Sequence, residues 1–585
     1  MRILRIDLSN QKVDEFTLPY KMVWEHIGGK GVASFILREE VNPAVDPLDA
    51  GNKLIIAVGP LTGTEFPTAN WYGVFFKSPL TEIYGESYAG GHAARRIWAS
   101  GYDVLIIERK AESAIWLSIN DGEVEFNDAG ELWGMTTHQT EDALKKEVGS
   151  DAGVLSIGPA GENLVLFASI VNDYNHSASR CGSGAVMGSK NLKAIAFGGS
   201  REPMIKDETG FSEVVVEVTE RIRKSRETNE IYPKYGTPFW VDAANELGVF
   251  PTRYWSGGVS KFSGQINAEA IIKDVLIEHT ACEGCPIGCR KLCEVKSGPF
   301  SNAKAELEYE TISSFGGLCD IGDIRAITGL VDLCNKLGLD PMTSGNIISF
   351  AIMLKDRGKI KTEPDLDYGN AGSIGGLLRL ISQRKDVGSN LANGVLRIAK
   401  RTGLENIAVH VKGLEPVGFD ARGLVGTGLS YAVASRGACH LRSHLFIQEL
   451  LGEVDRYSYS GKSLLLIDKE DRIVIYDSLL VCHLIQKILD WDLLESVLAS
   501  IFGVSIVKKV LKTTGSRIIS NTRSFNVEAG VGRKDDNLPE LFLEQPLPLG
   551  PSKGRFLDRK EFEKLLSDYY VLRKWDNQGA PFDFS

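Results

Sequence analysis

The chain has 585 residues, 43% of them hydrophobic and 24% charged, and its 76 acidic and 66 basic residues give a net charge of −10. This composition is typical of a water-soluble globular protein, and the lack of a long basic run argues against a nucleic-acid partner. No signal peptide precedes the first strand-like residues and no stretch of about 18 apolar residues occurs, so we expect a cytoplasmic protein without membrane contact.

The first 205 residues consist mainly of short apolar runs separated by glycine, proline and other turn residues. Such runs predict β-strands. They include KLIIAVG (53–59), YGVFFK (72–77), YDVLIIE (102–108), AIWLSIN (114–120) and LKAIAFG (192–198). A chain of this length is expected to form about three domains, and we place the first, a β-rich domain, at residues 1–205.

From about Glu202 onward the pattern changes to helical periodicity, as in segments 209–227 and 327–339. We expect helices from there to the C-terminus, with a few strand-like pieces such as SLLLIDKEDRIVIYDS (463–478). A β-rich front followed by a helical rear defines an α+β fold class. We expect two mainly helical domains, at 206–412 and 413–585.

The stretch CEGCPIGC (282–289) contains three of the nine cysteines of the chain. The glycine and proline residues between Cys282, Cys285 and Cys289 favour a tight loop over a helix. A four-iron cluster or a tetrahedral zinc needs a fourth ligand, for which Cys293 is nearest in sequence and Cys482 is the strongest distant candidate. The spacing favours an iron–sulfur cluster; a zinc site and inert buried thiols are the alternatives. A single cluster in so long a chain implies a second redox centre.

Eight short elements occur in order along nearly the whole chain: KSPLT (77–81), YAGG (88–91), SRCGSGAVMGSKNLKAI (179–195), CEGCPIGC, EYET (308–311), NKLGLD (335–340), RGACH (436–440) and DSLLVC (477–482). Together they resemble the aldehyde:ferredoxin oxidoreductases, which are tungsten enzymes with a bis-pterin cofactor. The resemblance implies that the β-rich domain forms a base for the cofactor and that the helical domains close over it. It also implies a [4Fe-4S] cluster held by Cys282, Cys285, Cys289 and Cys482, with Cys293 as a non-ligand.

The resemblance further implies a set of residues that bind the two pterins and the Mg²⁺ between their phosphates: Tyr88, Gly90, Gly91, His176, Ser177, Ser179, Arg180, Asn335, Gly338, Leu339, Asp340, Asp477 and Val481. Several positions depart from the family pattern. Tyr88 stands where asparagine is common, and residues 176–179 read His-Ser-Ala-Ser in place of Arg-Ala-Ala-Gly. Asn335 replaces an acid, so an amide has to bind the pterin nitrogens. Leu480 stands where the family has glycine, and Trp71 stands where a phosphate-binding arginine is often found.

Glu310 and His440 match the family's residues near tungsten. The resemblance implies that His440 donates a hydrogen bond to the carbonyl oxygen of the substrate and that Glu310 accepts a proton from water. Without the resemblance, the simpler interpretation is that Glu310 is a surface residue and that His440 has a structural role. Four aromatic residues are candidates for the wall of a substrate channel or for ordinary packing: Phe239, Trp240, Tyr254 and Trp255.

We therefore expect tungsten-dependent oxidation of an aldehyde to a carboxylic acid, with water as the oxygen source and ferredoxin as the acceptor of the electrons. One alternative is the catalytic subunit of a related complex that reduces carboxylates or aromatic thioesters. A second alternative is a zinc-stabilised binding protein without redox chemistry. A homodimer, or a complex with a small ferredoxin-like subunit, is compatible with the resemblance.

Overall fold

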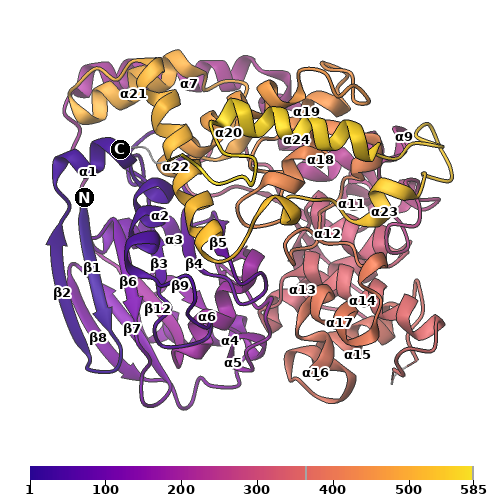
Figure 1. Ribbon diagram of the computed structural model, residues 1–585. Coiled ribbons are helices and arrows are strands. Elements are labelled where there is room, and N and C mark those ends of the chain that lie inside the picture. The colour runs from indigo at the N-terminus through magenta and orange to yellow at the C-terminus, as the bar shows by residue number, and fades with distance from the viewer. Residues whose placement is uncertain (363–364, 583–585) are drawn as a thin grey trace.

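The N-terminal part of the computed structural model, which describes residues 1–362 and 365–582, is built on two six-stranded sheets (Figure 1). The first contains β1 (Arg2–Asp7), β2 (Lys12–Thr17), β3 (Leu54–Ala57), β4 (Tyr72–Lys77), β5 (Tyr84–Ala89) and β6 (Val104–Glu108). The second contains β7 (Ile115–Asn120), β8 (Glu123–Asp128), β9 (Gly153–Ser156), β10 (Ile170–Asn172), β11 (His176–Ala178) and β12 (Leu192–Gly198). The strands predicted from the apolar runs are thus confirmed.

The two sheets have the same topology. Their strand orders are β2-β1-β6-β3-β4-β5 and β8-β7-β12-β9-β10-β11. In each set the first two strands form an antiparallel hairpin, the last strand pairs in parallel with the first, and the other three continue the sheet in antiparallel order. Residues 2–108 and 115–198 therefore form two equivalent units, a duplication that was not predicted from the sequence.

Helices dominate the rest of the chain, which confirms the α+β class. The N-terminal region carries α1 (Tyr20–His26), α2 (Gly29–Glu40), α3 (Ala93–Ala99), α4 (Thr137–Val148), α5 (Pro159–Glu162) and α6 (Ser183–Ser189). The next helices are α7 (Glu208–Lys224), α8 (Tyr232–Tyr235), α9 (Trp240–Glu246), α10 (Ser263–Ile266), α11 (Ala268–Asp274), α12 (Tyr309–Ile312), α13 (Ile324–Leu337), α14 (Pro341–Asp356), α15 (Ala371–Ser382), α16 (Asp386–Leu391) and α17 (Gly394–Thr402).

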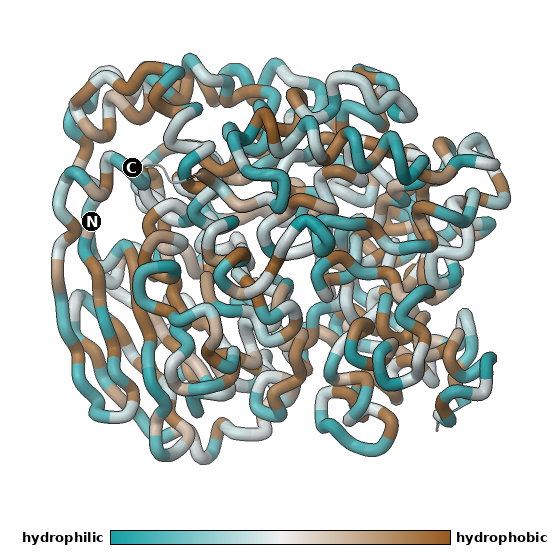
Figure 2. The backbone as a smooth tube through the Cα atoms, in the orientation of Figure 1, coloured by the Kyte–Doolittle hydropathy of each residue, from teal (hydrophilic) through white to brown (hydrophobic). Residues whose placement is uncertain are grey.

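The C-terminal helices lie on top of the sheets and beside the middle group in Figure 1. They are α18 (Val425–Val433), α19 (Leu445–Leu450), α20 (Lys462–Leu479), α21 (Trp491–Phe502), α22 (Lys508–Glu528), α23 (Glu540–Glu544) and α24 (Arg559–Arg573). Figure 2 shows hydrophobic and hydrophilic residues alternating along the outer helices α7 and α21. The division of the helical part at residue 412 stays a prediction.

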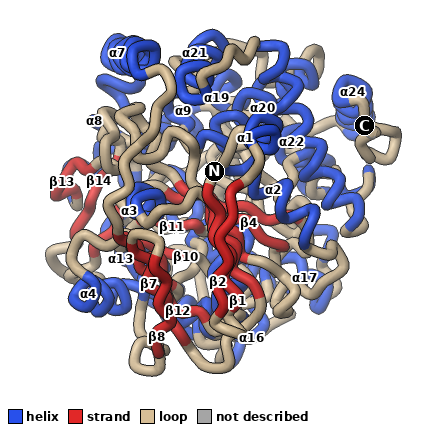
Figure 3. The backbone as a smooth tube through the Cα atoms, turned by 90° about the vertical axis from the view of Figure 1, so that its left-hand side faces the viewer, coloured by secondary structure: helices blue, strands red, loops and turns tan. Residues whose placement is uncertain are grey.

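A small third sheet lies between these regions along the chain. It contains β13 (Leu276–Thr280), β14 (Arg290–Glu294) and β15 (Lys304–Glu306), all antiparallel. In Figure 3, β13 and β14 lie at one side of the molecule, apart from the strands of the two large sheets. The cysteine loop 281–289 connects β13 to β14 without helix, as its glycine and proline residues predicted.

The prediction of a strand within residues 463–478 was wrong, because this segment lies inside α20. Its run of leucine, isoleucine and valine residues has the composition of a strand. However, α20 packs against α2, α18, α22 and α24, so it is covered on several sides and lacks a clear polar face. Tertiary burial decides the conformation here, and a helix hydrophobic on most sides cannot be told from a buried strand by periodicity alone.

The two largest hydrophobic cores differ in their relation to the cysteine loop. The larger one runs from the first sheet (Leu4) through the second (Ile195) to α13 (Leu330). The second joins the end of α20 and α21 to Ile287 of the loop, and Cys285 and Cys289 pack against it. Among the described residues, no helix combines the length and the hydropathy that a membrane span requires.

Candidate active site and cluster-binding loop

A cavity of about 280 Å³ lies where the second sheet, the cysteine loop and the helical region meet. Nine of the residues predicted for the site line it: Ser177, Ser179, Arg180, Cys282, Cys289, Glu310, Asn335, His440 and Cys482. They come from segments up to about 300 residues apart in sequence, and the fold brings them together around one enclosed space.

The four predicted thiols gather at one end of this cavity. Burial raises the pKa of each of them, to about 11 for Cys282, and nearby thiols raise it further at Cys282, Cys289 and Cys482. Cys482 lines the cavity together with Cys282 and Cys289, so it lies with the loop although it is almost 200 residues away in sequence. Cys293 is buried on β14 and does not line the cavity. Its thiol donates a hydrogen bond to the backbone carbonyl of Lys291.

The spacing of the thiols bears on which metal they can hold. Within residues 1–362 and 365–582, no three His, Cys, Asp or Glu side chains converge as the ligands of one metal ion do. A tetrahedral zinc holds all its sulfur ligands at about 2.3 Å. A four-iron cluster places one sulfur ligand on each iron and so separates the thiols more widely. The loop and Cys482 together supply the four thiols that a four-iron cluster needs.

The two predicted pterin motifs have the same local structure. The first, Asn335–Asp340, is the end of α13, with Gly338 as a left-handed C-cap (φ 70°, ψ 44°). The second, residues 477–482, is the end of α20, with Leu480 as its left-handed C-cap (φ 54°, ψ 45°). Leu480 thus adopts the conformation that glycine usually supplies at this position. The departure from the family pattern leaves the backbone shape of the motif intact.

The first motif is fixed by charge as well as by backbone. Asp340 caps α14, accepts hydrogen bonds from the Met342 amide (2.9 Å) and the Thr343 hydroxyl (2.8 Å), and pairs with Arg180 (3.2 Å). Arg180 also donates to the backbone carbonyl of Glu415 (2.5 Å). Leu339, buried between Gly338 and Asp340, forms an isolated antiparallel bridge with Ala168, two residues before β10.

The second motif carries a buried charge network. Asp477 pairs with Arg442 (2.5 Å), His483 (2.9 Å) and Lys30 (3.6 Å). Burial alone would raise the pKa of Asp477, but Arg442 and His483 hold it well below the usual value. Glu86 of β5 shares Lys30 and Arg442, so the network ties the first sheet to α20. Val481 follows in the second hydrophobic core and is fully buried.

The remaining predicted residues lie on or next to β5 and β11 and are not part of the cavity lining. A Cβ on Gly90 would lie 2.9 Å from the Cys282 sulfur, so this position has no room for a side chain. Gly91 has a φ of +106°, which also favours glycine. Tyr88 points its hydroxyl at Glu86 (2.8 Å), and His176 is buried at the start of β11.

Glu310 and His440 form a pair on the cavity wall. The His440 Nε2 lies 3.0 Å from a Glu310 carboxylate oxygen, although the residues are 130 positions apart. The His440 side chain is 4% exposed and that of Glu310 is 21% exposed. One side of the pair therefore faces the cavity while the rest is held in packed structure, as an acid–base pair requires.

The cavity wall is suited to an anionic group rich in hydrogen-bond acceptors. Three arginines line it: Arg180, Arg290 and Arg436. Among the described residues, three buried nitrogens of this wall lack a protein partner: the donor Arg436 Nε and the ring nitrogens His440 Nδ1 and His444 Nδ1. Buried polar atoms without partners are costly, so these atoms point to a ligand. A pterin with its phosphate meets this requirement.

Several site residues were not predicted. Arg290 follows Cys289 directly and Arg442 lies two residues after His440, so proximity to a motif was the available signal, but basic residues beside motifs are common. Trp71 lines the cavity where the family often has arginine. The four aromatic candidates do not line the cavity; Trp255, for example, is fully buried and donates to Asn346.

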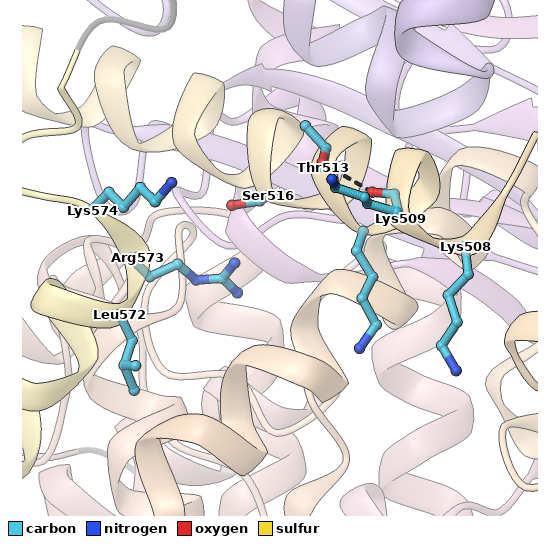
Figure 4. A pocket seen from close by; sticks show the side chains of 8 residues that line it. Lys508, Lys509, Thr513, Ser516, Leu572, Arg573 and Lys574 are labelled. Atoms are coloured by element: carbon cyan, nitrogen blue, oxygen red, sulfur yellow. Dashed lines mark hydrogen bonds between the residues drawn. The ribbon is translucent and has the colours of Figure 1, made fainter.

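A second hollow, of about 630 Å³, lies at the surface between α22 and α24 (Figure 4). Its lining includes Lys508, Lys509, Lys512 and Lys574, and it contains none of the predicted site residues. The larger hollow is thus a basic surface groove, and the chemistry-bearing residues lie in the smaller buried cavity.

The thiol end and the cation-lined cavity define a cofactor-dependent oxidoreductase. Comparison with known proteins agrees. The family model of the aldehyde ferredoxin oxidoreductase N-terminal domain matches residues 3–199, and the model of domains 2 and 3 matches residues 213–583. The chain therefore belongs to the aldehyde ferredoxin oxidoreductase family.

Individual relatives extend this result. The chain is 36% identical to the tungsten-containing aldehyde ferredoxin oxidoreductase of Pyrococcus furiosus, over 99% of this chain and 96% of that protein. It is 29% identical to the aliphatic sulfonate oxidoreductase, WOR-like subunit, of the same organism, over 99% and 95%. Among solved structures it shares the fold of the active-site complex BamBC of benzoyl coenzyme A reductase (TM-score 0.84, 24% identity, 99% of this chain and 95% of that chain).

Proposed function

We propose that the protein oxidises aldehydes to carboxylic acids, with water as the oxygen source, and passes the electrons through a [4Fe-4S] cluster to ferredoxin. The observation that carries this proposal is that one cavity is lined both by thiols from two distant segments and by the Glu310–His440 pair. The 36% identity to tungsten-containing aldehyde ferredoxin oxidoreductases supports the same assignment.

We assign a tungsten bis-pterin cofactor to the cavity. Its binding residues would come from the two helix C-caps at Gly338 and Leu480, from Ser177, Ser179 and Arg180, and from the Gly90–Gly91 turn. When bound, this cofactor supplies the acceptor for the two electrons that leave the aldehyde. We also assign a Mg²⁺ between the pterin phosphates, beside the backbone of Tyr88.

The residues of the chain then have distinct tasks. Oxidation of an aldehyde, with water as the oxygen source, yields a carboxylic acid, two protons and two electrons. The His440 imidazole is placed to donate a hydrogen bond to the carbonyl oxygen, which makes the carbon more electrophilic. The Glu310 carboxylate, 3.0 Å from His440, is placed to accept a proton from water. Burial of the pair limits access by bulk water.

Electrons would leave through the cysteine loop. Gly284 and Pro286 of this loop are exposed, and a Cβ on Gly284 would meet only open space. A ferredoxin can therefore approach the cluster at this surface. The loop, rather than the buried acid–histidine end, is the docking position that we assign to the electron acceptor.

The test is an assay of the anaerobically purified chain with an aldehyde and a viologen dye. The proposal predicts dye reduction that depends on aldehyde and yields one carboxylic acid for every two electrons. Dye reduction with an aliphatic sulfonate and none with any aldehyde would contradict the assigned substrate class.

A further inference from the structure

Arg290 joins the thiol end of the cavity to a row of carboxylates. It follows Cys289 directly and lines the same cavity as three of the thiols. Its guanidinium pairs with Glu306 (3.1 Å) and Glu308 (2.9 Å) and donates to His176 Nδ1 (3.1 Å). The side chain is thus held by partners on two other segments, in a place where its charge faces the thiols.

The same guanidinium lies beside the predicted cluster ligands. Of the three arginines that line the cavity, Arg290 is the one next in sequence to a cluster thiol, and it shares the cavity with Cys282, Cys289 and Cys482. Other arginines of the cavity wall act elsewhere: Arg180 pairs with Asp340, and Arg436 donates to Cys439 and the backbone of Glu86. A fixed cation beside a cluster favours whichever redox state of that cluster carries more negative charge.

Glu308 extends the connection to the catalytic end. It caps α12, the helix that carries Glu310, and the charge of Glu310 acts on it. Arg290, Glu308, Glu310 and His440 therefore form a continuous series of charged and polar groups along one wall, from the thiols to the acid–base pair.

We propose that Arg290 is a positioning residue that raises the reduction potential of the cluster, and that Glu308 holds it in place and partly offsets its charge. This inference rests on the proposed function, because it requires the cluster. An electron that enters the cluster adds one negative charge beside the guanidinium. Arg290 keeps its proton, and no bond forms or breaks at it.

The experiment is an anaerobic redox titration of the purified holoenzyme, with the cluster followed by its spin signal and visible absorption. In Arg290→Gln the midpoint shifts to a more negative potential. At the wild-type midpoint, the ratio of reduced to oxidised cluster falls about tenfold, which is about 59 mV for a one-electron couple. Arg290→Lys keeps the charge and shows a smaller shift in the same direction.

Arg95→Gln is the matched control. Arg95 pairs with Glu283 of the same loop (3.4 Å), but its side chain is 50% exposed and does not line the cavity. Solvent screens the charge of Arg95, so the midpoint potential of the cluster in Arg95→Gln stays at the wild-type value. An Arg290→Gln protein with an intact cluster and an unchanged midpoint overturns the inference.

Glu308→Gln tests for a midpoint shift in the opposite direction. It also keeps the inference testable if the Arg290→Gln protein fails to assemble a cluster. It removes an anion that opposes Arg290, so the midpoint shifts to a more positive potential; an unchanged or more negative midpoint overturns the inference. These outcomes differ from failure of the proposed function. A wild-type protein that holds no four-iron cluster contradicts the proposed function, whereas a wild-type cluster insensitive to these substitutions contradicts the role of Arg290 alone.

Discussion

The two ends of the cavity differ in how close they lie to the surface. At the thiol end, a short loop with exposed glycine and proline residues carries three cysteines. At the other end, His440 is 4% exposed and is packed among Phe419 and Phe446. The first arrangement suits exchange of electrons with a partner, and the second suits chemistry that bulk water would disturb.

The ends also differ in how they are built. Three of the four thiols belong to eight consecutive residues, so only Cys482 depends on the global fold. Glu310 and His440 meet only because α12 and the 436–444 segment pack together. We therefore expect substitutions at the thiol end to remove a cofactor, and those at the other end to slow turnover with the cofactors retained.

The largest effect is expected for Cys482→Ala. It removes the one thiol supplied from outside the loop, so the four-iron cluster should be lost or converted, and the iron content should fall from about four per chain. Iron analysis and the low-temperature spin signal measure this. Cys293→Ala is the control and should keep the cluster, since Cys293 bonds Lys291 instead. An unaltered signal in Cys482→Ala would make Cys293 the fourth ligand.

A smaller but still large effect is expected for His440→Ala. Loss of a positioned proton donor typically costs about 10²- to 10⁴-fold in rate. Steady-state turnover with aldehyde and dye measures this, while metal analysis should find iron and tungsten unchanged. His138→Ala, at a half-buried histidine whose Nε2 bonds the Tyr174 carbonyl, should keep most of the activity. Full activity of His440→Ala would remove this residue from the mechanism.

The smallest effect concerns the helix C-cap shared by the two pterin motifs. Gly338→Ala should lower the free energy of unfolding by about 1–3 kcal/mol, because alanine is strained at φ 70°. Its Cβ would also lie 2.8 Å from the Gly158 amide nitrogen. Gly403→Ala is the matched control, with φ 69° and open space around the new Cβ.

Denaturant unfolding of both variants separates the two causes. Gly403→Ala should cost only the backbone strain, and Gly338→Ala should cost more because of the contact. Equal losses would mean that the Gly158 backbone does not press against this cap.

Local chemistry explains what the sequence revealed. Most strands of the two sheets and the loop of Cys282–Cys289 follow from apolar runs and turn residues, which act over a few positions. The α+β class follows from the order of these segments. The cluster loop was predicted as a loop for the same reason, because glycine and proline disfavour a helix there.

Other features depend on contacts between distant segments. The helix at 462–479 was mistaken for a strand because burial on several sides removes the amphipathic pattern. The shared topology of the two sheets was not predicted, since many sequences satisfy the same strand order. The roles of Arg290 and Arg442 appear only when Glu308 and Asp477 come beside them. Glu310 and His440 were predicted from the family resemblance, because neither stands in a local pattern that indicates catalysis.

The most direct test of the account is elemental analysis of the anaerobically purified chain. The account predicts about four iron atoms and about one tungsten atom per chain, with the iron in a single cluster. One zinc atom per chain, with no tungsten and no iron, would contradict it.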